Sequence, residues 1–159
     1  MRESLLKSFQ SSEGRRRLID ALISQPLIRD EDLAAVVEPY LRLEETFAGT
    51  DLIKQGASDT DLFLILSGAF SIAIDGRIVA QKEAGELVGE MAVVDPSAPR
   101  SASVIATSDS VVARIAEPDF SALADRYPRL WRRLALELAS QLRKCNAADP
   151  DREKAGHAA

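Results

Sequence analysis

The chain has 159 residues, of which 46% are hydrophobic, and 20 basic residues against 25 acidic ones give it a formal charge of −5. This length allows one domain with an appendage, and this composition is that of a folded globular protein, which excludes wholesale disorder. A single cysteine, Cys145, and a single histidine, His157, leave too few residues for an internal disulfide, a His- or Cys-rich metal site or a Ser-His-Asp triad.

The N-terminal stretch, from about Glu3 to Tyr40, carries a helical pattern. Apolar residues recur there at spacings of three and four, which places them on one helix face: Leu18, Ile19, Leu22 and Ile23. Asp30 is suited to cap a second, shorter helix running to Val37, and Pro26 separates the two helices.

From 41 to 115 the pattern changes to short apolar or alternating runs separated by glycines. The runs are Leu52-Ile53, 62–66, 70–74, 78–80, 104–106 and 111–113. Asp75-Gly76 lies between two of them and is a strong hairpin signal. This pattern is typical of short antiparallel strands in a sandwich or small barrel. We therefore expect an α+β fold, an antiparallel β-roll or jelly-roll flanked by helices at both ends.

The C-terminal stretch, from Pro118 onward, is helical again. An apolar stripe recurs every three or four residues: Leu130, Trp131, Leu134, Leu138, Leu142 and Cys145. We expect Trp131 to pack in the core or in a dimer, with stacking on a ligand base as the lesser alternative. The tail over 146–159 is small and polar and is expected to be disordered.

One stretch late in the β region carries the chemistry. Gly89 leads into Glu90-Met91-Ala92-Val93-Val94, which is long enough for one helical turn before Pro96. The free N–H groups of such a turn attract an anion, and glycine allows an oxyanion to approach the main chain. Arg100 lies just before a strand and can hold a phosphate with two donors, while Glu90 is an acceptor suited to a sugar hydroxyl. Together these groups describe a nucleotide site.

The two ends of this stretch, Gly89-Glu90-Met91-Ala92 and Pro99-Arg100-Ser101-Ala102-Ser103, resemble the phosphate-binding cassette of the cyclic nucleotide-binding domain. That family includes bacterial catabolite activators, kinase regulatory subunits and cyclic-nucleotide-gated channels. The block from Gly56 to Gly68 resembles the family's glycine-turn-strand-glycine block. The resemblance covers most of the chain, so we expect an N-terminal helical segment over 1–29, the cyclic nucleotide-binding domain over 30–145, and a tail or linker over 146–159.

The resemblance implies a role for each cassette residue. Glu90 is expected to accept the ribose 2′-hydroxyl, and Arg100 to pair with the cyclic phosphate. Backbone N–H groups near Met91, Ala92 and Ala102 are expected to complete the phosphate cradle, and the Ser101 hydroxyl to touch phosphate or a base edge. The expected nucleotide-binding residues are Gly89, Glu90, Met91, Ala92, Arg100, Ser101 and Ala102. No catalytic residue, metal or cofactor is expected, and the ligand is a 3′,5′-cyclic nucleotide.

The function that follows is that of a non-enzymatic sensor controlling a fused or partner effector. The favoured context is bacterial antiphage defence, in which such a domain reads cyclic UMP or cyclic CMP and activates a TIR domain. Three alternatives stay open: a metabolic sensor of cyclic AMP or cyclic GMP, a truncated catabolite-activator-like transcription factor, and a degenerate dimerisation module that binds no ligand. A homodimer through the C-terminal helix is the expected oligomeric state.

The expected location is the cytoplasm. Residues 1–7 are charged and lack the apolar core of a signal peptide, and no run approaches the roughly 18 apolar residues of a membrane span. The acidic balance argues against nucleic acid binding through overall charge. We therefore expect no direct contact with nucleic acid or membrane.

Overall fold

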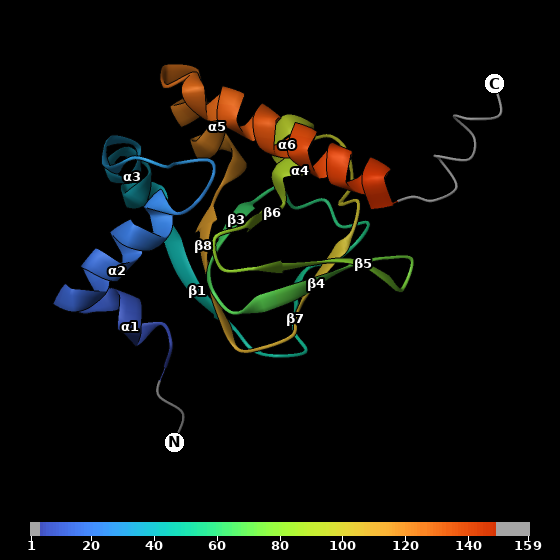
Figure 1. Ribbon diagram of the computed structural model, residues 1–159, viewed down its shortest axis with the longest axis horizontal. Helices are drawn as coiled ribbons and strands as arrows, with labels where there is room; N and C mark the ends of the chain where they lie inside the picture. The colour runs from blue at the N-terminus through green and yellow to red at the C-terminus, as the bar shows by residue number, and fades with distance from the viewer. Residues whose placement is uncertain (1–3, 149–159) are drawn as a thin grey trace.

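The computed structural model describes residues 4–148 and shows a β-roll of two four-stranded antiparallel sheets between two groups of helices (Figure 1). The first sheet has the order β1-β8-β3-β6, and the second has the order β2-β7-β4-β5. Their strands are β1 (Arg42–Thr46), β2 (Asp51–Ile53), β3 (Leu62–Ser67), β4 (Ala69–Ile74), β5 (Arg77–Glu83), β6 (Leu87–Val88), β7 (Ser103–Ala106) and β8 (Ser110–Ile115). The expected α+β class with an antiparallel roll is confirmed.

The short helix predicted after Asp30 is confirmed among the N-terminal helices. They are α1 (Lys7–Gln10), α2 (Ser12–Ile23), α3 (Glu31–Val37) and the 3-10 helix η1 (Glu38–Tyr40). The Ser11 hydroxyl accepts the Gly14 N–H at 2.9 Å to cap α2, and the Asp30 carboxylate accepts the Leu33 N–H at 2.8 Å to cap α3. Local hydrogen-bonding preference therefore sets where both helices begin.

The β4–β5 hairpin confirms the turn predicted at Asp75-Gly76. Both residues have positive φ, 53° and 77°, which is the conformation that a tight two-residue hairpin turn requires. The strands it joins pair from Ile74–Arg77 to Ala69–Glu83, with a bulge between Ile72 and Ala73. β5 is an edge strand, and its predicted apolar run 78–80 is exposed.

The core has two parts on opposite faces of β3. Leu62, Leu64 and Leu66 pack against the helices, whereas Phe63 and Ile65 face the interior of the roll. Successive side chains of a strand point to opposite faces, so a strand buried on both faces is continuously apolar. That placement accounts for the unbroken apolar run at 62–66.

The C-terminal helices are α5 (Glu117–Arg126) and α6 (Arg129–Ala148), and α6 passes above α4 (Glu90–Val94) (Figure 1). Trp131 packs edge-on against Phe120 with ring centroids 5.6 Å apart, as expected for a packing residue. The predicted apolar stripe packs within the chain as far as Leu138. Leu142 is 61% exposed and Cys145 is exposed, so in the far half of α6, residues 139–148, the stripe lies on the surface of the single chain.

The helix boundary also differs from the expectation for the tail. The helix α6 continues to Ala148, so residues 146–148, which were expected in the disordered tail, are helical. The rest of that predicted tail lies outside the described residues.

Gln25 connects the N-terminal helices to the roll. It is fully buried, and its Nε2 donates to the carbonyl oxygens of Ile65 at 3.1 Å and Glu86 at 3.3 Å. Ile65 lies in β3, and Glu86 immediately precedes β6, the strand that leads into the cassette. The side chain therefore fixes the helices to the backbone that positions the candidate site.

We expect Gln25→Ala to lower the free energy of unfolding by about 1–2 kcal/mol, because a buried donor and its packing volume are lost. Urea denaturation of the purified chain measures this change. Gln81→Ala on the exposed strand β5 is the control and should stay within about 0.5 kcal/mol of wild type. Equal stability of all three chains would contradict the structural role of Gln25.

Candidate functional site

Gly89 forms the turn between β6 and α4. Any larger residue at this position would force the neighbouring atoms to move. The φ of Gly89 is +88°, which favours glycine. A Cβ atom built on it would lie 2.7 Å from the Asp61 carbonyl oxygen and 2.9 Å from Arg100 Nη1. The turn therefore brings the start of α4 directly against the Arg100 side chain.

The guanidinium of Arg100 is buried at the centre of this region, with the side chain only 3% exposed. Its Nη2 donates to Asp59 Oδ2 at 2.8 Å and to the Asp61 carbonyl at 2.7 Å, its Nε donates to Asp59 Oδ2 at 3.3 Å, and its Nη1 donates to the Gly89 carbonyl at 3.3 Å. A guanidinium has five N–H donors, so one, on Nη1, is left for a further acceptor. The one anionic partner, Asp59, is 48% exposed.

Backbone pairing and a second arginine hold the loop before β3 in place. The Gly56 N–H donates to the Arg100 carbonyl, and the Arg100 N–H donates to the Ala57 carbonyl, both at 2.8 Å. The Asp61 carboxylate pairs with Arg114 Nη1 at 3.2 Å. The partners of the Arg100 guanidinium are thus fixed from several sides, which presents the arginine in a preformed geometry.

Glu90 begins α4 and is 8% exposed. Its burial raises the pKa of the carboxyl group, because desolvation disfavours the charged form. The Glu90 N–H, the Gln141 side chain on α6 and the charge of Lys82 on β5 act in the opposite direction, while Glu137 adds to the increase. The site therefore holds a carboxylate that is costly to keep charged in the ligand-free protein.

The structure brings two of the sequence-predicted residues into contact, Gly89 and Arg100, and Glu90 follows Gly89 at the start of α4. Ala92 is buried behind them, whereas Met91 is 56% exposed. Ser101 is exposed and Ala102 is half-buried, in the segment that leads into β7. The roles expected for the N–H groups of Met91, Ala92 and Ala102 and for the Ser101 hydroxyl stay predictions.

Sequence reasoning missed the polar residues that complete the region. Asp59 lies inside the glycine-flanked block 56–68, where its acidic side chain just before a strand was the available signal. Gln141 lies three residues after Leu138 and therefore on the same helix face, where it interrupts the apolar stripe. Lys82 carried no signal, because its charge acts on Glu90 only through the tertiary fold.

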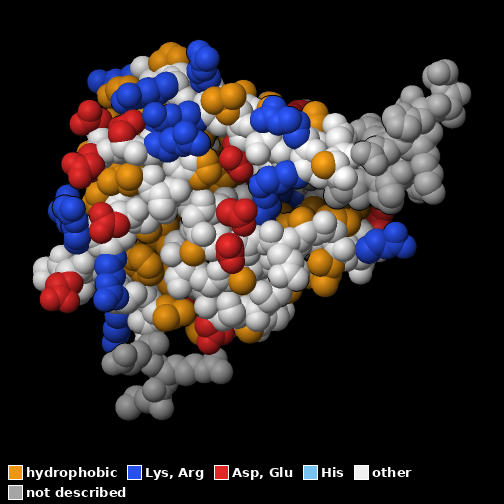
Figure 2. All heavy atoms as spheres, viewed as in Figure 1, with side chains coloured by type: hydrophobic (Ala, Val, Ile, Leu, Met, Phe, Trp, Pro, Cys, Tyr) orange, Lys and Arg blue, Asp and Glu red, His pale blue; other side chains and the backbone are white. Residues whose placement is uncertain are grey.

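The N-terminal end of α6, by contrast, belongs to the scaffold. The indole N–H of Trp131 donates to Asp125 at 2.9 Å, and Arg133 donates to the Ile28 carbonyl and pairs with Asp30 at 3.3 Å. Arg129 reaches the same carboxylate at 3.7 Å. Figure 2 shows basic side chains gathered with acidic ones over this part of the molecule. These contacts anchor the first turns of α6 to the N-terminal helices.

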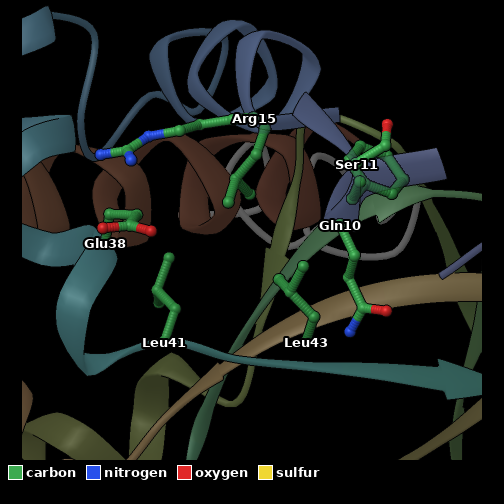
Figure 3. Close-up of a pocket in the computed structure, with 8 residues that line it drawn as sticks. Gln10, Ser11, Arg15, Glu38, Leu41 and Leu43 are labelled. Atoms are coloured by element: carbon green, nitrogen blue, oxygen red, sulfur yellow. The ribbon is translucent and has the colours of Figure 1, made fainter. Parts of the chain in front are cut away.

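A pocket of about 270 Å³ lies elsewhere, between α1, α2, η1 and β1 (Figure 3). Leu41 and Leu43 point into it, and Arg15 extends from α2 toward Glu38. It includes none of the predicted nucleotide-binding residues. Within residues 4–148 no cluster of three metal-ligating side chains is present, and no helix there is long and apolar enough to cross a membrane.

The chain is similar to known proteins over most of its length. The family model described as the cyclic nucleotide-binding domain matches residues 44–127. The Pycsar effector protein XpPycTIR of Xanthomonas perforans is 39% identical over 89% of this chain and 47% of its own length. The crystal structure of the Thermus thermophilus catabolite activator protein superimposes with a TM-score of 0.69 at 28% identity, covering 77% of this chain and 61% of that one. The regulatory domain of Toxoplasma gondii PKA, crystallised with cAMP, gives a TM-score of 0.63 at 27% identity over 72% of this chain and 46% of that one.

The effector relatives are longer than the part of them that this chain matches. The chain spans about half the length of the Pycsar effector proteins that it matches, between 46% and 47% of each.

The raised pKa of Glu90 has a consequence for stability. A group whose pKa is higher in the folded than in the unfolded chain contributes most below the unfolded pKa, and this contribution is lost as the pH rises through the folded pKa. At pH 7 we therefore expect Glu90→Gln to stabilise the ligand-free chain by up to about 1 kcal/mol. The advantage should disappear below about pH 4, where Glu90 is protonated in both states.

Thermal unfolding of wild type and Glu90→Gln between pH 4 and pH 8 measures this difference. Glu83→Gln, an exposed carboxylate at the end of β5, is the control and should show little pH-dependent change. A Glu90→Gln variant that is clearly less stable than wild type at pH 7 would contradict the assigned cost of this charge.

Proposed function

This chain belongs to the cyclic nucleotide-binding domain family, and we propose that it binds a 3′,5′-cyclic mononucleotide through the cassette formed around Gly89, Glu90 and Arg100. The observation that carries the proposal is the geometry of Arg100. A nearly fully buried cation, held by backbone carbonyls on two sides and by one half-exposed carboxylate, is a preformed partner for a phosphate monoanion.

The cyclic phosphate would take the free Nη1 donor of Arg100 and compete with Asp59 for the remaining ones. The Asp59 carboxylate is screened by solvent on its exposed side, so it is the weaker anionic partner once a phosphate enters. The N–H groups of Met91, Ala92 and Ala102 and the Ser101 hydroxyl are the further donors that we assign to the phosphate. Because the Arg100 guanidinium is already held by its protein partners, little ordering of that side chain accompanies binding.

Glu90 would accept the ribose 2′-hydroxyl. Its charge, which is costly in the empty site, gains a hydrogen bond when the hydroxyl arrives. The base would lie against apolar surface: Figure 2 shows apolar side chains exposed between the far half of α6 and the β4–β5 hairpin. Ile78 and Val79 of β5 are 61% and 53% exposed, an unusual surface for an edge strand in a protein without a ligand.

The proposed context is the sensor part of an antiphage effector that responds to cyclic UMP or cyclic CMP. Support comes from the effector relatives named above, which share 36–40% identity with almost the whole of this chain. The chain would act as a regulatory domain without a catalytic step of its own, and the enzyme would be a fused or partner effector such as a TIR domain. A cytoplasmic homodimer through α6 is part of this proposal.

A sensor of cyclic AMP is the second candidate, and the likeness to the cAMP-bound kinase domain favours it at a lower identity of 27%. The hypothesis of a truncated transcription factor is supported only by the structural likeness to the catabolite activator protein. A degenerate dimerisation module would need neither Glu90 nor Arg100 in the arrangement described above.

We test the ligand by thermal unfolding of the purified chain with the 3′,5′-cyclic nucleotides of uridine, cytidine, adenosine and guanosine. A ligand at about 100 times its Kd stabilises the fold by about 2.7 kcal/mol, which for this size raises Tm by about 2–6 °C. The proposal predicts a selective shift with a pyrimidine nucleotide. A selective purine shift would support the second candidate, and no shift with any of the four would contradict cyclic nucleotide binding.

Arg100→Ala is the site control for that experiment. Loss of the arginine side chain should weaken binding of the selected nucleotide by roughly 2–5 kcal/mol, because the phosphate loses its buried cationic partner. Binding as tight as that of wild type would show that the phosphate lies elsewhere.

Asp59→Ala tests the competition between carboxylate and phosphate. Without Asp59 the buried guanidinium lacks an anion, so the free chain should lose about 1–2 kcal/mol of stability, less than for a fully buried pair. A bound phosphate replaces the missing charge, so the nucleotide-induced rise in Tm should be larger than in wild type. Asp51→Ala, an exposed acid on β2, is the matched control, and an unchanged or smaller rise in Asp59→Ala would contradict the competition.

A further inference from the structure

A second arginine, Arg114 on β8, lies between two carboxylates. Its Nη1 pairs with Asp61 Oδ2 at 3.2 Å, and its Nη2 pairs with Glu44 Oε2 at 3.1 Å. Its guanidinium carbon lies 5.0 Å from the centre of the Phe63 ring, within the range of a cation–π contact. Because β8 lies between β1 and β3 in the first sheet, the two ion pairs connect β8 to β1 on one side and to the start of β3 on the other.

The strand register explains why Arg114 takes these partners. Arg42 on β1 is directly opposite Arg114. Like charges that face each other across two paired strands are destabilising, so acids on both sides stabilise Arg114. Asp61 comes two residues before Phe63, the β3 residue opposite Arg114, and this spacing keeps its side chain on the same face of the chain. The ion pair between Arg114 and Asp61 is therefore a diagonal contact across the strands.

Asp61 also orients Arg100. Its carbonyl oxygen accepts the Nη2 of Arg100 at 2.7 Å, and a Cβ atom built on Gly89 would lie 2.7 Å from that same oxygen. The pairing of β3 with β8 begins at Leu62, so Asp61 lies just outside the paired residues. The side-chain ion pair with Arg114 thus holds the Asp61 backbone at a point where the pairing of the strand has ended.

The contribution of Arg114 to the site is geometric, because its charge is compensated at close range. The two carboxylates that flank it, Glu44 and Asp61, together carry more charge than the one guanidinium. Attraction of a phosphate by Arg114 over a longer distance is therefore weak. What Arg114 supplies is a fixed position for Asp61, and Asp61 is the residue that contacts Arg100.

We propose that Arg114 is a positioning residue for nucleotide binding: it holds the Asp61 carboxylate, which fixes the Asp61 carbonyl and thereby sets the orientation of the Arg100 guanidinium. The proposal rests on the proposed function, because the group that Arg100 would receive is the cyclic phosphate. Arg114 touches no part of the ligand in this scheme, since its own donors remain with Asp61 and Glu44. A binding side chain that is held from behind loses less freedom when the ligand arrives.

Calorimetric titration with cyclic UMP, and with cyclic CMP, cyclic AMP and cyclic GMP in parallel, tests the proposal. Arg114→Met keeps a long side chain beside Phe63 but has no donor for Asp61. We expect it to bind the selected nucleotide about 3- to 10-fold more weakly, the range that one net hydrogen bond supplies. Arg42→Met removes the same charge from the opposite, exposed position on β1, and this matched control should stay within about 2-fold of wild type. Binding by Arg114→Met as tight as that of the control would overturn the proposal.

Asp61→Ala separates positioning from charge. It removes a negative charge near the cassette, so an effect of charge would tighten phosphate binding, whereas loss of the pair with Arg114 should weaken binding by about 3- to 10-fold. Asp59→Ala removes the same charge two residues earlier and should have the opposite effect, because Asp59 competes with the phosphate for Arg100. The double variant of Arg114 and Asp61 should bind no more weakly than either single variant, because both changes break one interaction. Tighter binding by Asp61→Ala, or additive losses in the double variant, would overturn the proposal.

The Arg100 Nε–H resonance gives a readout that needs no nucleotide. In the ligand-free chain Arg114→Met and Asp61→Ala should shift this resonance in the same direction, because both release the carbonyl that orients the guanidinium. Arg42→Met should leave the resonance in place, and Arg114→Lys, which keeps a cation for Asp61, should restore most of the wild-type position. An unchanged resonance in Arg114→Met would overturn the proposal. If Arg114→Met does not fold, Asp61→Ala decides by the same criterion.

The two failures are distinguishable. If no nucleotide binds wild type, the proposed function fails, while the resonance in the ligand-free chain still decides whether Arg114 orients Arg100. If Arg100→Ala abolishes nucleotide binding but Arg114→Met changes neither the affinity nor the resonance, the proposed function stands and the positioning role is wrong.

Discussion

The buried guanidinium of Arg100 is the interaction on which the rest of the site depends. Its donors connect the loop before β3, through Asp59 and the Asp61 carbonyl, to the turn at Gly89 that starts α4. A buried cation is costly unless it is paired and hydrogen-bonded, so these partners are required for the fold as well as for any ligand. The close approach of Arg100 also excludes a side chain at Gly89, the residue before Glu90.

Two charged side chains at the site are energetically unfavourable in the ligand-free protein, and the proposed binding of a nucleotide would stabilise both. Arg100 has a carboxylate partner that is half exposed, and Glu90 is a desolvated carboxylate whose pKa is raised. A ligand with one anion and one hydroxyl donor satisfies both. The two charged groups lower the free energy of unfolding of the ligand-free chain. In the proposed complex the ligand pairs with both groups, and this pairing adds to the binding affinity.

Much of this was predictable from the sequence, for identifiable physical reasons. The caps at Asp30 and the turn at Asp75-Gly76 depend on local backbone preferences, and both were found. The cassette was predicted because Gly89, Glu90 and Arg100 occur in a recognisable order. The surface position of Leu142 could not be predicted in this way, since this residue continues the apolar period of α6 but is 61% exposed in the single chain. Contacts such as the ion pair between Asp59 and Arg100 join distant segments and leave no local signal.

The most direct measurement of the central claim is the side-chain NMR signal of Arg100. The Nε–H resonance can be assigned by its disappearance in Arg100→Lys and followed as cyclic UMP or another cyclic nucleotide is added. The account predicts that this resonance shifts in step with binding, because the phosphate takes over from Asp59 as the anionic partner. A resonance that stays unchanged while the nucleotide binds elsewhere on the chain would contradict it.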